Sequence, residues 1–159
     1  MSEQEYAFRL LTKSDAEFIV SWRYQPPYDV YDLDQASVSS LLRPDFHYYG
    51  VRRDDEMIGF RCFGDDAKVS GGDYSLPALD MGGGLRPDFT GRGLGSSLLR
   101  AAMDFARQQF CSDRFRVTVA SFNERAVRTC VKVGFVRTSE FDRPSDGRRF
   151  TILMKEAAE

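Results

Sequence analysis

One stretch of the sequence decides the fold, and it reads Leu79-Asp80-Met81-Gly82-Gly83-Gly84-Leu85-Arg86-Pro87-Asp88-Phe89-Thr90-Gly91-Arg92-Gly93-Leu94-Gly95. Its first seven residues have the length of a strand, and residues 93–110 carry apolar side chains at helical spacing. The order is therefore strand, glycine-rich turn, long helix. A helix N-terminus presents unpaired N–H groups and about half a positive charge, which suits a phosphate or pyrophosphate. The glycines of the turn let the backbone approach such a ligand without a Cβ in the way.

Two familiar nucleotide-binding patterns do not fit this turn. A Walker A loop requires a lysine after its last glycine, and none follows here. A dinucleotide fingerprint requires GxGxxG after the first strand of the fold, but Ser96 occupies the last glycine position and several strands precede the loop. A GxGxG turn alone fits equally well with a plain helix-entry loop, so the ligand must be identified from the rest of the chain.

The pattern outside this stretch predicts a mixed sheet with helices on both faces. We expect a helix that starts near Ser14 as its N-cap, with Glu17 completing a capping box, and that ends before Pro26. Residues 28–43 are a weaker helical stretch, and Asn123 caps a helix that runs to about Val133. Strands are expected at 6–11, 46–53, 57–63, 79–85, 115–120, 135–141 and 149–154. The order is β-α-α-β-β-β-α-β-α-β-β, an α/β fold, and the absence of a linker or repeat indicates one domain over residues 1–159.

Composition excludes several classes of function. The chain of 159 residues has a net charge of -2, which argues against binding nucleic acid through general phosphate neutralisation. It contains no apolar run of the roughly 20 residues that cross a bilayer, so we expect no membrane span. Its cysteines, Cys62, Cys111 and Cys130, lack the spacing of a zinc site or a disulfide framework. We therefore expect a cytoplasmic protein without a metal, in which His47 has a structural role.

The sequence resembles the GNAT superfamily of N-acetyltransferases in two segments. The family's loop, [RQ]-x-x-G-x-[GA], is matched by Thr90-Gly91-Arg92-Gly93-Leu94-Gly95, with Thr90 where Arg or Gln is usual. The family's Asn-x-x-Ala…Lys-x-Gly-Phe segment is matched by Asn123-Glu124-Arg125-Ala126-Val127-Arg128-Thr129-Cys130-Val131-Lys132-Val133-Gly134-Phe135. The resemblance covers nearly the whole chain in element order. It implies an acetyl-CoA-dependent N-acetyltransferase.

The resemblance also implies where acetyl-CoA binds. Its pyrophosphate would lie on the backbone N–H groups of Arg92 to Ser96, with Arg92 replacing the cation missing at Thr90. Its pantetheine would lie between strands 79–85 and 115–120, which splay apart in this family. A backbone N–H near Gly84 or Leu85 would hold the thioester oxygen as negative charge develops on it. Asn123 would cap its helix and bond the pantetheine amide, although a cap alone explains it as well. The cofactor-binding residues are thus Gly84, Leu85, Thr90, Gly91, Arg92, Gly93, Leu94, Gly95, Ser96 and Asn123.

Transfer of an acetyl group to an amine requires a base and an acid. The first candidate base is Asp80, on the strand beside the expected thioester, although a carboxylate there also suits an ion pair with an arginine. Cys130 stands where many relatives have the tyrosine that protonates the departing thiolate. A thiol has the right basicity for that role. The alternative is that Cys130 is a small buried side chain and that water supplies the proton.

The segment between the two expected helices usually forms one wall of the acceptor site in this family. Aromatic faces and carboxylates attract an ammonium group, so an amine acceptor is expected, and the residues are Trp22, Tyr28, Asp29, Tyr31 and Asp32. The alternative is that the tyrosines belong to the core and the aspartates to solvated turns. A non-catalytic acyl-CoA sensor remains a second hypothesis because the usual tyrosine and Arg or Gln are missing. Exposed strand edges near the C-terminal hairpin would permit a homodimer.

Overall fold

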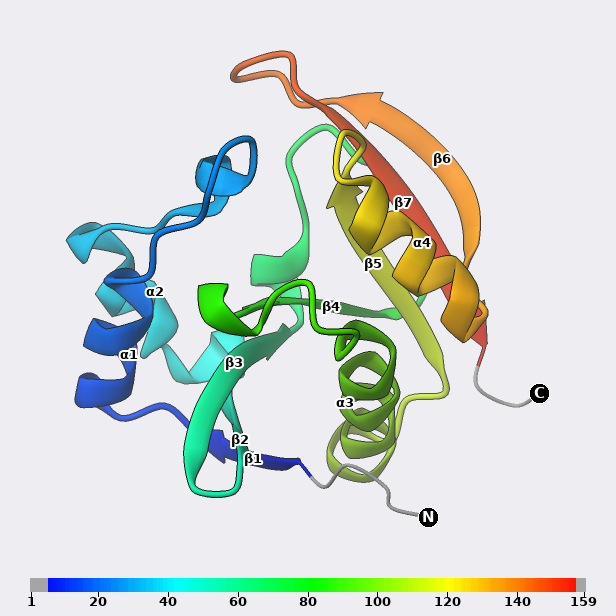
Figure 1. Cartoon of the computed structure of the whole chain (residues 1–159). Coiled ribbons are helices and arrows are strands. Elements are labelled where there is room, and N and C mark those ends of the chain that lie inside the picture. Colours follow the sequence, from blue (N-terminus) through cyan, green and yellow to red (C-terminus); the bar gives the residue numbers. More distant parts are fainter. Residues whose placement is uncertain (1–5, 157–159) are drawn as a thin grey trace. The chain divides into compact units, whose positions relative to one another are not determined.

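The computed structural model describes residues 6–156 and contains the expected succession of elements (Figure 1). The helices are α1 (Lys13–Val20), α2 (Val38–Leu41), α3 (Gly95–Phe110) and α4 (Glu124–Val133). The strands are β1 (Ala7–Leu10), β2 (Tyr48–Arg53), β3 (Glu56–Phe63), β4 (Leu79–Leu85), β5 (Arg114–Ala120), β6 (Val136–Asp142) and β7 (Arg149–Glu156). The predicted α/β class and element order are confirmed.

The strands form a seven-stranded mixed sheet in the order β1-β2-β3-β4-β5-β7-β6. The pairs β1–β2, β2–β3, β5–β7 and β6–β7 are antiparallel. β4 and β5 are parallel, and their ladder covers only Leu79–Phe115, Asp80–Arg116 and Met81–Val117. Both strands continue beyond that ladder, β4 to Leu85 and β5 to Ala120.

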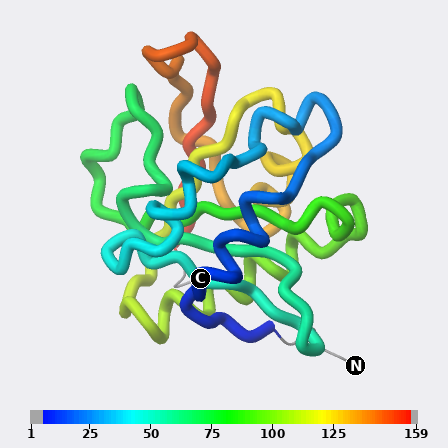
Figure 2. The backbone as a smooth tube through the Cα atoms, turned by 90° about the vertical axis from the view of Figure 1, so that its left-hand side faces the viewer, coloured from blue at the N-terminus to red at the C-terminus, as the bar shows by residue number. Residues whose placement is uncertain are grey.

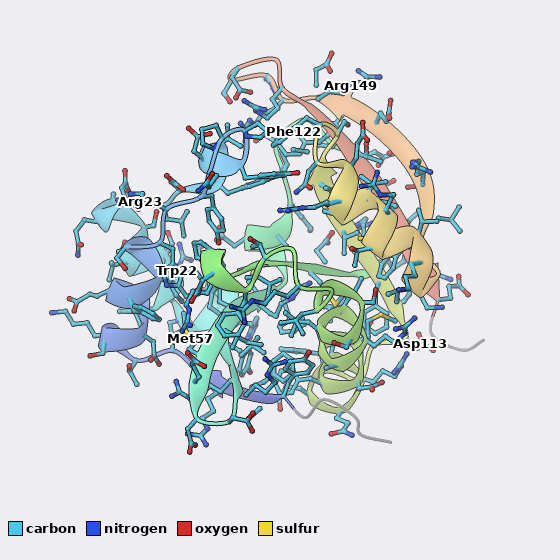
Figure 3. The ribbon with its side chains drawn as sticks, viewed as in Figure 1. Trp22, Arg23, Met57, Asp113, Phe122 and Arg149 are labelled. Atoms are coloured by element: carbon cyan, nitrogen blue, oxygen red, sulfur yellow. The ribbon has the colours of Figure 1, made fainter. Side chains whose placement is uncertain are left out.

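The internal contacts of the chain divide it into two compact units, and β4 contributes to each. The described part of the first unit consists of residues 6–62 and 83–94. Its helices α1 and α2 and strand β3 enclose a core cluster of Ala16, Ile19, Val20, Trp22, Leu41 and Met57. Trp22 and Met57 of this cluster are labelled in Figure 3. The Trp22 ring contacts Phe18 and Phe60, at centroid distances of 5.5 Å and 6.0 Å.

The described part of the second unit consists of residues 63–82 and 95–156. Side chains alternate along β5, so that Phe115 and Val117 share one face while Arg116 and Thr118 share the other. Phe115 is fully buried, with Arg107 of α3 over its ring, and α3 in turn contacts α4. The opposite face is covered by the long loop that precedes β4, traced in green in Figure 2.

Several local predictions were wrong in detail. The N-cap of α1 is Thr12, whose side chain accepts from Asp15 N while Asp15 bonds back to the Thr12 backbone. Ser14 lies inside the helix, two residues after the observed cap, and Phe18 is 43% exposed. Residues 28–43 are two 3-10 helices, Tyr28–Tyr31 and Gln35–Ser37, followed by the short α2. His47 lies in a left-handed turn, with φ of 53°, ahead of its expected strand.

No helix within residues 6–156 is long and apolar enough to span a membrane. In the same residues, no group of three or more His, Cys, Asp or Glu side chains is arranged to hold a metal ion.

Candidate functional site

The residue that precedes the glycine-rich turn is held by several side-chain contacts. Arg86 follows β4, and its guanidinium donates to Asp88 at 2.7 Å, to Glu56 at 2.8 Å and to Met57 O at 3.0 Å. These two carboxylates, Asp88 first, raise the pKa of Arg86. The guanidinium also lies over the ring of Phe89, 4.6 Å from its centroid. The polypeptide is therefore held firmly just before the turn starts.

The turn itself leaves backbone donors unused. Gly91 and Gly93 have left-handed backbones, with φ of 75° and 77°, a conformation that favours glycine. Within residues 6–156, the backbone N–H groups of Gly91, Arg92 and Gly93 donate to no protein acceptor. A Cβ built on Gly93 would have no heavy atom within 4 Å, so the space beside it is open. Unpaired donors around open space are what an anionic ligand satisfies.

The side chains that flank these donors have separate roles. The Thr90 hydroxyl donates to Pro87 O at 2.7 Å and so stabilises the 3-10 helix Pro87–Phe89. Arg92 extends over the Phe89 ring, 4.7 Å from its centroid, and is exposed. Arg92 thus places a cation beside the turn, while the Thr90 hydroxyl bonds the backbone; a role of either residue in binding acetyl-CoA stays a prediction.

The turn continues directly into α3, where the second unit resumes. Gly95 opens the helix, and a Cβ there would lie 3.2 Å from Thr129 Cγ2 of α4. The first turn of α3 therefore passes close to α4, and glycine at position 95 permits that approach. Ser96, the next residue, is half-buried. The helix has 16 residues, which gives its N-terminus a full macrodipole.

The strand β4 is irregular at its glycines. Gly83 has φ of 143°, and a Cβ there would lie 2.1 Å from Phe60 O. No other residue fits that position without moving β3. A Cβ on Gly59 would likewise lie 2.7 Å from Gly84 O, so β3 and β4 approach closely around Gly84. Beyond this point the Leu85 carbonyl accepts from the Tyr24 hydroxyl at 2.6 Å.

Asn123 and Cys130 lie on α4, in the second unit. Asn123 is the N-cap, and its Oδ1 accepts from Ala126 N at 3.1 Å. Cys130 is 6% exposed on the buried face of the helix, and its thiol is free of any disulfide. Val131, the next residue, is 44% exposed.

Asp80 forms a buried ion pair. Its two carboxylate oxygens accept from Arg116 Nε and Nη2, at 2.8 Å and 2.9 Å, and each side chain is only 3% exposed. The hydrogen bond to Asp80 is also the main cause of the raised pKa of Arg116. Arg116 further donates to Leu76 O at 2.7 Å and lies over the Tyr74 ring. The carboxylate thus anchors a network that holds the loop preceding β4.

The acceptor candidates belong to the first unit. Trp22 is in the core, 6% exposed, with its indole N–H buried and without an acceptor in the described chain. Tyr28, Asp29 and Tyr31 lie on one short 3-10 helix, where Asp29 and Tyr31 are exposed. Asp32 follows them, and its Oδ1 accepts from Tyr24 N at 2.9 Å.

Two neighbouring residues of this segment were not predicted. Arg23, labelled in Figure 3, donates from Nη1 to Val20 O, Trp22 O and Leu33 O, and so closes the segment on itself. Tyr24 connects it to β4 through the hydrogen bond to Leu85. Only the aromatic run around Tyr24 marked it in the sequence, because its partner is 61 positions away.

Comparison with known proteins identifies the family. The model of the acetyltransferase (GNAT) family matches residues 8–135. The chain belongs to the GNAT family of acetyltransferases. It is thus an enzyme that transfers acyl groups, and both the turn and the Asn123 segment lie within the matched residues. A search of the curated proteins finds no match.

Solved structures of the same fold are similar over almost the whole chain. An acetyltransferase (GNAT family) from Bacillus anthracis has 12% identity and a TM-score of 0.76, over 100% of this GNAT chain and 99% of that one. The aminoglycoside acetyltransferase AAC(6')-Ib in complex with coenzyme A has 18% identity and a TM-score of 0.76, over 96% and 95%. A mutant of the spermidine N-acetyltransferase SpeG from Vibrio cholerae has 15% identity and a TM-score of 0.70, over 96% and 94%.

Proposed function

We propose that this GNAT chain transfers the acetyl group of acetyl-CoA to a primary amine of a small molecule or a peptide N-terminus. The observation that carries the proposal is the set of unused N–H groups at Gly91, Arg92 and Gly93, which lies just before the N-terminus of α3. The pyrophosphate of acetyl-CoA binds to the backbone from Arg92 to Ser96, with Arg92 as the neighbouring cation. This arrangement offers a dianion both donors and positive charge without any lysine.

The chemistry is a direct transfer. The neutral amine attacks the thioester carbonyl carbon, a C–N bond forms, and the carbonyl oxygen becomes an oxyanion that a backbone N–H of Gly84 or Leu85 stabilises. The C–S bond then breaks, the thiolate takes one proton, and the new amide loses one. Cys130 or water supplies the thiolate's proton, and Asp80 or a water chain removes the proton of the ammonium group.

The acceptor we propose is a cationic amine, bound by Tyr28, Asp29, Tyr31 and Asp32. Asp29 and Asp32 make no ion pair with a lysine or arginine of residues 6–156, whereas acidic side chains such as Asp45, Asp88 and Asp146 each pair with an arginine. Ammonium groups are attracted both by such carboxylates and by tyrosine faces. Two of the structural neighbours are named for the polyamine spermidine and for aminoglycosides, which are cationic amines.

The test compares two glycines that have similar backbone angles and open surroundings but lie in different turns. Gly93 and Gly147 have φ of 77° and 73°, and a Cβ on either would have nothing within 4 Å. Alanine therefore imposes the same strain at both positions, about 1 kcal/mol or more. We expect Gly93→Ala to weaken acetyl-CoA binding at least tenfold in calorimetry, whereas Gly147→Ala, at the β6–β7 turn, leaves the Kd unchanged.

The same proteins are then assayed for thiol release against a panel of polyamines, aminoglycosides and peptides. Release that depends on one class of amine identifies the acceptor. Tight acetyl-CoA binding without release from any amine would favour the non-catalytic sensor, for which the cysteine at position 130 is the main argument. Equal loss of binding in both glycine variants would contradict the placement of the pyrophosphate.

A further inference from the structure

The peptide group that joins Leu85 and Arg86 is held from both sides. On one side the Arg86 N–H donates to Ile58 O of β3 at 2.8 Å. On the other side the Leu85 carbonyl accepts from the Tyr24 hydroxyl at 2.6 Å, a short distance for a bond between neutral groups. All four residues belong to the first unit. The end of β4 is therefore fixed by β3 and by a side chain from a remote segment.

Strand geometry gives the direction of the next donor. The N–H and C=O of one residue in a strand point to the same edge, and those of the following residue point to the opposite edge. Because Arg86 N–H points to β3, the N–H and C=O of Leu85 point away from β3. The ladder of β4 with β5 covers only Leu79–Met81, so Leu85 lies beyond it. Tyr24 thus binds the Leu85 carbonyl at the same edge of β4 as the Leu85 N–H.

Tyr24 is itself held in place. Its backbone N–H donates to Asp32 Oδ1 at 2.9 Å, and Arg23 beside it is bonded to three carbonyls. Burial, followed by the nearby Asp32 carboxylate, raises the pKa of Tyr24 to about 12. The phenol therefore remains protonated, and remains a donor, at any pH at which an acetyltransferase is assayed. A Cβ on Gly84 would lie 3.4 Å from the hydroxyl oxygen, so glycine leaves room for it.

We propose that Tyr24 is a positioning residue for acetyl transfer: by bonding Leu85 O, it orients the Leu85 N–H that stabilises the thioester oxyanion. This inference rests on the proposed function. Tyr24 touches neither reacting group and acts through the backbone of β4. The oxyanion exists only on the way through the transition state, so a correctly aimed N–H lowers the barrier and contributes little to ground-state binding.

The decisive variant is Tyr24→Phe, which removes one hydroxyl and keeps the ring. We expect kcat to fall about tenfold, while the Kd of acetyl-CoA and the KM of the amine change less than twofold. The matched control is Tyr49→Phe, which removes the hydroxyl of a largely buried tyrosine of β2 in the same unit. Its kcat is expected to match that of the unaltered protein. Loosening of the fold alone would instead raise KM or Kd, which separates a structural role from a positioning role.

A second variant covers the case in which Tyr24→Phe does not fold. Asp32→Ala frees the Tyr24 backbone, and kcat measured at saturating amine is expected to fall in the same direction. An unchanged kcat in Tyr24→Phe, or a rise in KM alone, overturns the proposal. If the unaltered protein transfers no acetyl group to any amine, the proposed function fails first, and that result is distinguishable because it does not depend on Tyr24.

Discussion

Asp80 and Arg116 are each 3% exposed, and the two hydrogen bonds that join them leave neither carboxylate oxygen without a partner. A base at this position would have to accept a proton while Arg116 stays buried beside it. That step exchanges a satisfied ion pair for an unpaired guanidinium, which is unfavourable in a protein interior. At the scale of single residues, the geometry therefore favours the structural role that the sequence left open for Asp80.

The corresponding prediction concerns Asp80→Asn. We expect the free energy of unfolding to fall by about 3–5 kcal/mol, because the buried guanidinium loses its counter-charge. Asp65→Asn is the control: it breaks an exposed pair with Lys68 and is expected to cost less than about 1 kcal/mol. Urea unfolding measures both. If folded Asp80→Asn retains its stability but loses a thousandfold in kcat, Asp80 is the base and the structural interpretation is wrong.

At the scale of elements, the periodicity of apolar residues predicted most of the helices and strands. Capping and turn residues predicted only some of their ends. β4 was predicted with both ends correct, since seven consecutive residues fit one strand between turn signals. The start of α1 was misplaced because Thr12 with Asp15 and Ser14 with Glu17 make the same capping pattern two residues apart. Gln35–Ser37 form a 3-10 helix ahead of the short α2, where Asp34 bonds its own segment at Ala36 N, which competes with a longer α-helix.

The candidate site was predictable where it depends on local sequence. The glycine turn and the cap of α4 are contained in short motifs, so both were found. The bond from Tyr24 to Leu85 and the Asp80–Arg116 pair join positions 61 and 36 residues apart. Contacts of that kind depend on the register of strands and on how a loop closes, and a single sequence contains no direct record of either.

The element-scale prediction separates two roles of Asn123. Its Oδ1 caps α4, and the family resemblance gives its amide a second role in binding pantetheine. Asn123→Ser keeps a capping oxygen without the amide, whereas Asn123→Ala removes both. We expect the alanine variant to lose about 1 kcal/mol of stability and the serine variant much less. If Asn123 also binds the ligand, both variants weaken acetyl-CoA binding equally; an unchanged Kd in the serine variant would reduce Asn123 to a cap.

At the scale of the whole molecule, similarity of fold depends only loosely on sequence identity. Relatives with 12% and 18% identity share TM-scores of 0.76 with this chain. What these structures share with this chain is the fold, which many sequences can satisfy. We propose that the acceptor depends instead on loops such as residues 23–34, whose conformation is not determined by the class of fold.

The stability of the whole molecule should depend on pH in two windows. Hydrogen bonds from Arg43, Arg86 and Arg143 lower the pKa of Asp45, Asp88 and Asp146, respectively. A carboxyl group with a lowered folded pKa contributes stability above its unfolded pKa, near 4, and loses it as the pH falls further. All three carboxyls are exposed, so salt screens these contributions and the acid loss is expected to be small until well below pH 4.

In the alkaline range, the stability depends on the ionisation of Tyr24. Its folded pKa of about 12 lies above the unfolded value of 10.0, so the folded state keeps a proton that the unfolded chain releases. The stabilisation is therefore complete below pH 10 and is lost between pH 10 and 12. The free energy of unfolding falls by at most about 1.4 kcal/mol per pH unit in this window. The actual slope is expected to be smaller because the ring is only half-buried. The measurement is urea unfolding of the unaltered protein and Tyr24→Phe from pH 7 to 11.5. We expect a constant difference in stability up to pH 9.5 and a narrowing one above it, since the remaining tyrosines ionise alike in both. A difference that stays constant to pH 11.5 would mean that solvent reaches the hydroxyl, and the bond to Leu85 could then not hold the end of β4 as proposed.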